Sequence, residues 1–216
     1  ADGSPRDRPF GMRITALVAA LFLLVGSHPS LANQRSADEP QTSTIRIRLK
    51  GPTLRVRCRG GDCTVTLARD GAGIAVSVTR TRGGSPFTFA KTVHLPTNIA
   101  IETGFGTDSI TVGDVSVPGF LRIGTADGDD LLIVDGTSAA KKTSIDTGGG
   151  NDTVHLAPGV IGGPFRLATH SGDDKVDVTE GQFQSRAGFN GGPGTDSLTV
   201  STVAFPTPPA VTAFEQ

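Results

Sequence analysis

Five aspartates recur along this chain at a constant interval of 22 residues, and each stands two positions after a glycine. A strict repeat of about 20 to 50 residues is typical of a solenoid, in which no repeat can bury its apolar face alone and each covers its neighbour. The repeat therefore predicts a stack of equal coils with the aspartates in one column: Asp108, Asp130, Asp152, Asp174 and Asp196.

The residues around each aspartate alternate between apolar and mostly polar, which indicates strands with one face in a core. Three such segments per repeat describe one coil of a parallel β-helix. The sequence predicts an all-β fold, a parallel β-helix (β-solenoid) with about five regular coils over residues 98–205. The apolar columns are Ile110, Leu132, Val154, Val176 and Leu198; Ile101, Ile123, Ile145, Leu167 and Phe189; and Val117, Ala139, Ile161, Phe183 and Phe205.

The glycines that precede the aspartates form a column of their own. A position that is glycine in every repeat indicates a backbone with positive φ, or a backbone packed too tightly for a side chain. The members of this column are Gly106, Gly128, Gly150, Gly172 and Gly194.

Stacked carboxylates stand roughly 5 Å apart and repel one another by about 3 kcal/mol at an effective dielectric of about 20. Two interpretations offset this repulsion, and both stay open. In the first, each carboxylate accepts hydrogen bonds from backbone N–H groups of its own turn. In the second, the column binds calcium, which takes about six to eight oxygens from carboxylates and carbonyls.

The turns resemble the calcium-binding repeats of the RTX (hemolysin-type) family, whose pattern is G-G-x-G-x-D-x-U-x with U apolar. GGPGTDSLT at 191–199 matches every fixed position, whereas two other turns keep only the third glycine, the aspartate and the apolar residue. The RTX repeat is nine residues long with loops on both edges, whereas this chain uses 22 residues per coil and has one such edge. The resemblance implies calcium as a cofactor, with the side chains of Asp108, Asp130, Asp152, Asp174 and Asp196 as ligands.

Cys58 and Cys63 are the chain's two cysteines, and the alternating segments on either side place them at facing positions of a hairpin. In a secreted chain such a pair is expected to form a disulfide. The alternative is a reduced metal-binding pair, which lacks further thiols and nearby histidines.

The first 43 residues are expected to carry targeting signals rather than fold. Residues 1–32 are interpreted as an upstream extension and a signal peptide, because an apolar run at 16–26 precedes small residues ending at Ala32. The run is too short for a membrane span of about 20 residues, and an uncleaved anchor is the alternative. Residues 33–43 are interpreted as a flexible leader of a protein that is secreted, periplasmic or at the cell surface, with no transmembrane span after cleavage.

The two ends of the solenoid need caps, because an open end of a β-helix is an unpaired sheet edge. Residues 44–97 are expected to form a β-meander or irregular coils. The segment GGDCTVTL at 60–67 resembles a degenerate glycine-aspartate turn, which favours irregular coils. Residues 206–216 are expected to form a C-terminal cap or tail.

The formal net charge of −1 hides two oppositely charged parts. Residues 33–96 carry 11 Lys and Arg against 4 Asp and Glu, whereas residues 97–200 carry 6 against 14. The basic N-terminal region is either a solvated face or a contact for a polyanion, the cell envelope or the acidic repeats of another copy. No nucleic-acid partner is expected, and the oligomeric state stays open.

The chain is expected to be non-catalytic, with a structural or surface-association role. The alternative is a carbohydrate-active enzyme similar to pectate-lyase-like β-helices, with Arg122, Ser144 and Arg166 in one outward column beside Glu102 and Asp146. Such enzymes build clefts from long loops between strands, and the repeats contain no insertion. The chain also lacks Trp and Tyr, the usual platforms for sugar stacking.

Overall fold

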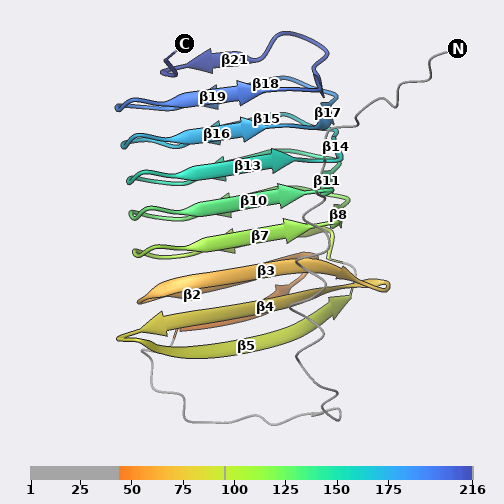
Figure 1. The fold of residues 1–216 in the computed structure, drawn as a ribbon. Helices are drawn as coiled ribbons and strands as arrows, with labels where there is room; N and C mark the ends of the chain where they lie inside the picture. The colour runs from red at the N-terminus through yellow and green to blue at the C-terminus, as the bar shows by residue number, and fades with distance from the viewer. Residues whose placement is uncertain (1–43, 95, 216) are drawn as a thin grey trace, which may run out of the picture. The chain divides into compact units, whose positions relative to one another are not determined.

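The computed structural model describes residues 44–94 and 96–215, and all the regular structure in these ranges is β-strand (Figure 1). The expected signal peptide and leader, residues 1–32 and 33–43, lie outside the described residues. No helix in the two described ranges has the length and apolar character needed to cross a lipid bilayer. The predicted all-β class is confirmed.

The strands form three sheets, and each regular coil contributes one strand to every sheet. Sheet A has the order β1 (Thr44–Lys50), β2 (Thr53–Arg59), β6 (Asn98–Glu102), β9 (Leu121–Gly124), β12 (Thr143–Asp146), β15 (Phe165–Ala168), β18 (Ala187–Asn190) and β21 (Ala210–Thr212). Sheet B has the order β19 (Ser197–Val200), β16 (Lys175–Val178), β13 (Thr153–Ala157), β10 (Leu131–Asp135), β7 (Ser109–Gly113), β3 (Asp62–Asp70), β4 (Gly73–Arg82) and β5 (Ser85–His94). Sheet C has the order β20 (Val203–Ala204), β17 (Gly181–Phe183), β14 (Val160–Ile161), β11 (Ser138–Ala139) and β8 (Ser116–Val117).

Neighbouring coils stack in parallel, with partners 22 residues apart in the sequence. In sheet A, Ile145 pairs with Ile123 on one side and with Leu167 on the other. In sheet B, Leu132 pairs with Ile110. Figure 1 shows the resulting rungs from β7 to β19. The predicted parallel β-helix of about five regular coils is confirmed.

The apolar columns fill the interior of the stack. Near its C-terminal end, aromatic rings replace aliphatic side chains: Phe183 stacks on Phe205 with ring centroids 4.9 Å apart, and Phe165 meets Phe183 edge-on at 5.1 Å. The fully buried members of the columns include Ile101, Ile123, Ile145, Leu167 and Phe189 in sheet A, Ile110, Leu132, Val154 and Val176 in sheet B, and Val117, Ala139, Ile161 and Phe183 in sheet C.

The N-terminal strands combine one further coil with an antiparallel cap. β2 pairs in parallel with β6, and β3 pairs in parallel with β7, so β2 and β3 extend the stack by one coil. β1 adds to β2, while β4 and β5 continue sheet B beyond β3, all in antiparallel fashion. The region therefore contains both an irregular coil and a meander.

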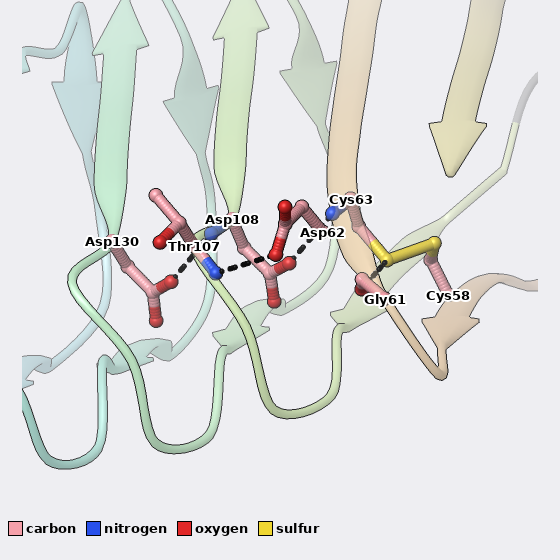
Figure 2. The surroundings of a disulfide bond; sticks show 7 residues. All are labelled: Cys58, Gly61, Asp62, Cys63, Thr107, Asp108 and Asp130. Atoms are coloured by element: carbon pink, nitrogen blue, oxygen red, sulfur yellow. Dashed lines mark hydrogen bonds between the residues drawn. A yellow bond between two sulfur atoms is a disulfide. The ribbon is translucent and has the colours of Figure 1, made fainter. Parts of the chain in front are cut away.

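Cys58 and Cys63 form the predicted disulfide, with Cα atoms 6.2 Å apart (Figure 2). The prediction that they face each other across a hairpin is wrong, because β2 belongs to sheet A and β3 belongs to sheet B. The disulfide instead closes the corner between two sheets, where both residues are buried.

The C-terminal end continues the coil in short strands. β20 pairs with β17, and β21 extends sheet A beside β18. Glu215 forms a parallel bridge with Ser197, which brings the end of the described chain onto β19. Phe205 and Phe214 are partly buried against the core, so aromatic side chains contribute to closing this end.

Candidate functional site

The five aspartates of the repeat lie in one column, at the turns that lead into sheet B. Their side chains are buried, with exposed fractions of 1–3%. In each step, Oδ1 accepts a hydrogen bond from the backbone N–H of the aspartate one coil earlier, at 2.7–2.9 Å. Figure 2 shows the step from Asp108 to Asp130. We call this series of bonds the aspartate ladder; it consists of Asp108, Asp130, Asp152, Asp174 and Asp196.

Each end of the aspartate ladder has a terminating group. Cys63, which forms the disulfide with Cys58, donates its N–H to Asp108 Oδ1 at 2.7 Å (Figure 2). At the other end, the carboxylate of Glu215 accepts the N–H of Asp196. The interpretation that each carboxylate binds its own turn needs correction, because every donor belongs to the preceding coil. The ladder therefore fastens coil to coil, which a solenoid needs because single coils are not stable alone.

A second, exposed ladder has its accepting side chains just before Cys63 and just before three of the buried aspartates, Asp130, Asp152 and Asp174. Here a side-chain oxygen accepts the N–H of the following coil, so these bonds run in the opposite direction to the aspartate ladder. This ladder is not among the features predicted from the sequence, although Asp129, Asn151 and Asp173 recur at the same 22-residue spacing and could have indicated it. The acceptor and donor pairs are Asp62 with Thr107, Asp129 with Asn151, Asn151 with Asp173, and Asp173 with Thr195.

The glycine column explains why the turns can stack so closely. The glycines two residues before the buried aspartates have φ between 128° and 147°, which side-chain-bearing residues rarely adopt. At Gly128, an added Cβ would lie 2.1 Å from the carbonyl oxygen of Gly106 in the coil below. Both reasons anticipated for the glycine column, positive φ and tight packing, are therefore present.

Burial changes the acidity of the aspartate ladder. It raises the pKa of Asp108 to about 6 and the pKa of Asp152 to about 7, from an ordinary value of 3.8. Burial also raises the pKa of Asp130 and the pKa of Asp174. Neighbouring carboxylates add to the shift, whereas the accepted N–H and a nearby threonine hydroxyl oppose it. Loss of water is the largest cause because these side chains are almost inaccessible to solvent.

Calcium fits the aspartate ladder only in part. The second carboxylate oxygen, Oδ2, of all five aspartates is buried and has no hydrogen-bond partner among the described residues, so it could accept a cation. However, Oδ1 faces an N–H donor, and in the described ranges no three His, Cys, Asp or Glu side chains converge as a metal site. Calcium prefers about six to eight oxygens. The assignment of these aspartates as calcium ligands stays a prediction.

The residues proposed for a lyase site share the outward face of sheet A. Ser144 pairs with Arg122 on one side and Arg166 on the other, as the spacing predicts. The carboxylates one column away already have partners: Glu102 binds Arg57 at 2.8 Å, and Asp146 binds His170 Nε2 at 3.0 Å. The strands between are joined by turns of equal length, so no inserted loop rises beside the two arginines.

Open grooves occur at a different corner of the solenoid. Two overlapping grooves, with volumes of about 710 and 460 Å³, lie where the β3–β4 turn meets the corner between sheets B and C. Both are lined by Arg69, Asp114 and Ser116. None of the three lyase candidates on sheet A lines either groove.

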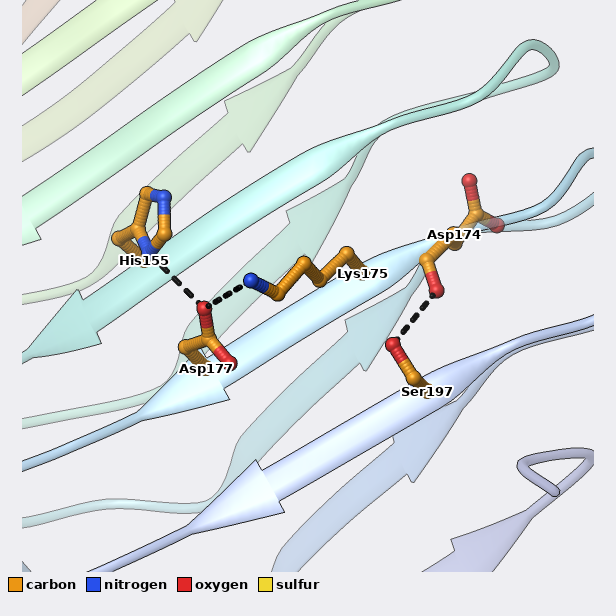
Figure 3. Close-up of polar contacts among 5 residues, drawn as sticks. All are labelled: His155, Asp174, Lys175, Asp177 and Ser197. Carbon is orange, nitrogen blue, oxygen red and sulfur yellow. Dashed lines mark hydrogen bonds and ion pairs between the residues drawn. The ribbon is translucent and has the colours of Figure 1, made fainter. Parts of the chain in front are cut away.

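The outward face of sheet B carries a small charged cluster. His155 Nδ1 and Lys175 Nζ each lie 3.3 Å from Asp177 Oδ2 (Figure 3). Such partly exposed pairs contribute about 0 to 1 kcal/mol to stability. The cluster is therefore a surface contact with a small effect on stability.

Comparison with models of known protein families, with curated proteins and with solved structures found no match. The resemblance to RTX repeats therefore rests on the residues of the turns alone. What the structure establishes is the stacked β-solenoid and its two hydrogen-bonded ladders.

Proposed function

We propose that this chain is a secreted, non-catalytic β-solenoid with a structural or surface-association role. The observation that carries the proposal is the uninterrupted coil. Arg122, Ser144 and Arg166 lie on an open sheet face, and the carboxylates nearest to them are paired with basic side chains. Catalytic sites are usually concave and exclude water, and neither of the two grooves described above is lined by these three residues. The disulfide supports an oxidising compartment.

The test of a non-catalytic role is a direct assay for lyase chemistry. We expect no unsaturated product when the expected mature chain, residues 33–216, is incubated with uronate polymers with and without calcium, followed by ultraviolet absorbance. An Arg122→Ala/Arg166→Ala variant serves as the matched control. Product formation that this variant abolishes would establish the enzyme alternative instead.

A second candidate is calcium binding by the aspartate ladder, favoured by the row of buried Oδ2 atoms without partners. Isothermal titration with calcium and the accompanying change in Tm test it. The comparison variant is Asp130→Asn/Asp152→Asn/Asp174→Asn, which keeps an oxygen for each N–H but removes three carboxyl groups that can ionise. Binding heat and a raised Tm in the unchanged chain alone would support calcium. No heat and no change in Tm would leave the ladder a structural device.

A further inference from the structure

The outward face of sheet A carries a row of arginines that crosses the strands along the stack. Arg48 pairs with Arg55, and the same column continues through Ala100 to Arg122 and through Ser144 to Arg166. Because strands are about 4.8 Å apart, Arg55, Arg122 and Arg166 recur at intervals of about 10 Å. We call Arg48, Arg55, Arg122 and Arg166 the cationic row; all four are exposed.

Further cations lie on either side of the cationic row. Arg46 and Lys50 are exposed on β1, and Lys142 and Arg186 are exposed just before β12 and β18. The acidic residues on the strands of this face are Glu102 and Asp146, which bind Arg57 and His170 respectively. The positive charge of the face is thus largely uncompensated over six adjacent strands, from β1 to β15.

Apart from Glu102 and Asp146, the acidic residues of the repeats lie outside the strands of sheet A. The aspartate ladder is buried, and Asp129 and Asp173 belong to the exposed ladder along the turns. Within the same coils, positive charge therefore lies on the outward face of sheet A and exposed negative charge lies along the turns. This adds to the excess of basic residues in 33–96 and of acidic residues in 97–200. A surface of one sign raises the local concentration and association rate of oppositely charged partners.

We infer that the outward face of sheet A binds a linear acidic polysaccharide, with the polymer running along the stack over the cationic row. The inference rests on the surface-association role proposed above and names its partner. Guanidinium groups bind carboxylates and sulfates through paired hydrogen bonds, and all four members of the cationic row are arginines. An extended polymer with regularly spaced anionic groups matches a row that repeats across several coils.

Other polyanions fit this face less well. Single-stranded nucleic acids need aromatic platforms for their bases. The chain has no Trp or Tyr, and the Phe side chains on the strands of sheet A, Phe165 and Phe189, are buried. A membrane surface favours apolar side chains beside the cations. The large exposed apolar residues of sheet A, Leu49 and Val211, are not on the outward face, because they align with the buried Leu54 and Phe189.

The experiment measures binding of the expected mature chain to heparin, as a sulfated polymer, and to polygalacturonate, as a carboxylated one, at a series of salt concentrations. We expect Arg55→Ala/Arg122→Ala/Arg166→Ala to weaken binding by about tenfold or more and to make its salt dependence shallower. The matched control, Arg69→Ala/Arg82→Ala/Lys91→Ala, removes the same charge from β3, β4 and β5. It is expected to change binding by less than about twofold.

Three outcomes would overturn the inference: no binding to either polymer, equal losses in both triple variants, or tighter binding to RNA or to vesicles of anionic lipid. A preference between heparin and polygalacturonate would tell whether sulfate or carboxylate is the preferred group. Circular dichroism of both variants verifies that the fold is intact. Failure here would leave the non-catalytic role standing, because that role is tested by the absence of lyase product.

Discussion

Replacement of Gly150 by alanine is expected to lower the free energy of unfolding by about 4 kcal/mol or more, a loss seen only when a substitution has a specific structural cause. Gly150 has φ of 128°, and an added Cβ would lie 2.4 Å from the carbonyl oxygen of Gly128. Both the strained backbone and the overlap oppose a side chain. Urea denaturation followed by far-ultraviolet circular dichroism measures the loss.

The turn cannot easily move to relieve this overlap. Gly150 N–H donates to Ser171 in the next coil at 2.7 Å, and Gly128 N–H donates to Gly149 at 2.6 Å. A shift of the turn would break these bonds and the adjacent step of the aspartate ladder. The same geometry recurs at Gly172, where the Cβ would lie 1.9 Å from the Gly150 oxygen, so the effect should recur at other turns.

The matched control is Gly124→Ala, in strand β9. Its Cβ would meet nothing nearer than the Asp146 carbonyl oxygen at 3.9 Å, and its φ lies outside the left-handed region. Alanine in a strand is favoured over glycine by roughly 0.5 to 1 kcal/mol, so this variant should be as stable as the original chain or slightly more stable. Equal losses in the free energy of unfolding for Gly150→Ala and Gly124→Ala would show that positive φ and close packing do not make the glycine column essential.

The coil could be predicted from the sequence because every coil places the same residue types in the same surroundings. Ile101, Ile123 and Ile145 share one environment, so the apolar requirement appears three times at one spacing. An apolar column that repeats every 22 residues is therefore stronger evidence for the coil than the alternation within any single strand. For the same reason, the alignment of Arg122 with Arg166 followed from counting residues alone.

Features that occur once, outside the repeat, could not be predicted in the same way. The alternation in β2 and β3 is the same whether two strands pair in a hairpin or lie in different sheets, so the disulfide was predicted but its setting was not. Likewise, β4 and β5 show strand periodicity but no repeat that distinguishes a cap from further coils. Which strand pairs with which depends on the three-dimensional packing, and the alternation of apolar and polar residues does not specify it.

The direction of hydrogen bonding was also beyond the sequence. An aspartate column indicates repulsion that something must offset, but not which N–H groups do so. The structure places the donor for Asp152 Oδ1 on Asp130, one coil away. Glu215 closes the ladder although it lies 19 residues after Asp196, outside the 22-residue spacing. Glu215 lies beside Asp196 because of the path of the last coil, which the repeat does not specify.

The stability of the solenoid is expected to fall as pH rises from about 4 to about 7 in calcium-free buffer. An aspartate in the unfolded chain has a pKa near 3.8, whereas burial raises the pKa of Asp152 to about 7 and the pKa of Asp108 to about 6. Between these values the folded state binds more protons than the unfolded state, so raising the pH favours unfolding. For Asp152 alone the shift corresponds to about 4 kcal/mol.

Protonation also explains how the unpartnered oxygens can be accommodated. A proton on Asp152 Oδ2 makes this oxygen a donor, and the nearby Thr147 Oγ1 is buried without a hydrogen-bond partner among the described residues. The neutral carboxyl keeps Oδ1 as the acceptor for the Asp130 N–H. Both oxygens of Asp152 can thus be satisfied when this carboxyl is neutral, and repulsion from Asp130 and Asp174 acts on Asp152 only in the charged state.

Asp152→Asn separates the charge from the hydrogen bond. The amide oxygen still accepts the Asp130 N–H, so we expect stability close to the original chain at pH 4 and greater by about 2 kcal/mol or more at pH 8, with a shallower pH dependence. Asp152→Ala leaves the buried Asp130 N–H without an acceptor and should be less stable than Asp152→Asn at both pH values by about 1 to 3 kcal/mol. Urea denaturation at each pH measures both variants.

Asp127→Asn provides the control, because it removes an exposed carboxylate from the same kind of turn. We expect its stability to lie within about 0.5 kcal/mol of the original chain, as is usual for substitutions of exposed side chains. A chain that gains stability between pH 4 and 7 would contradict the argument, as would an Asp152→Asn variant with an unchanged pH dependence. Either result would mean that the ladder holds its aspartates ionised, and that charge repulsion within the stack is offset by something other than protons.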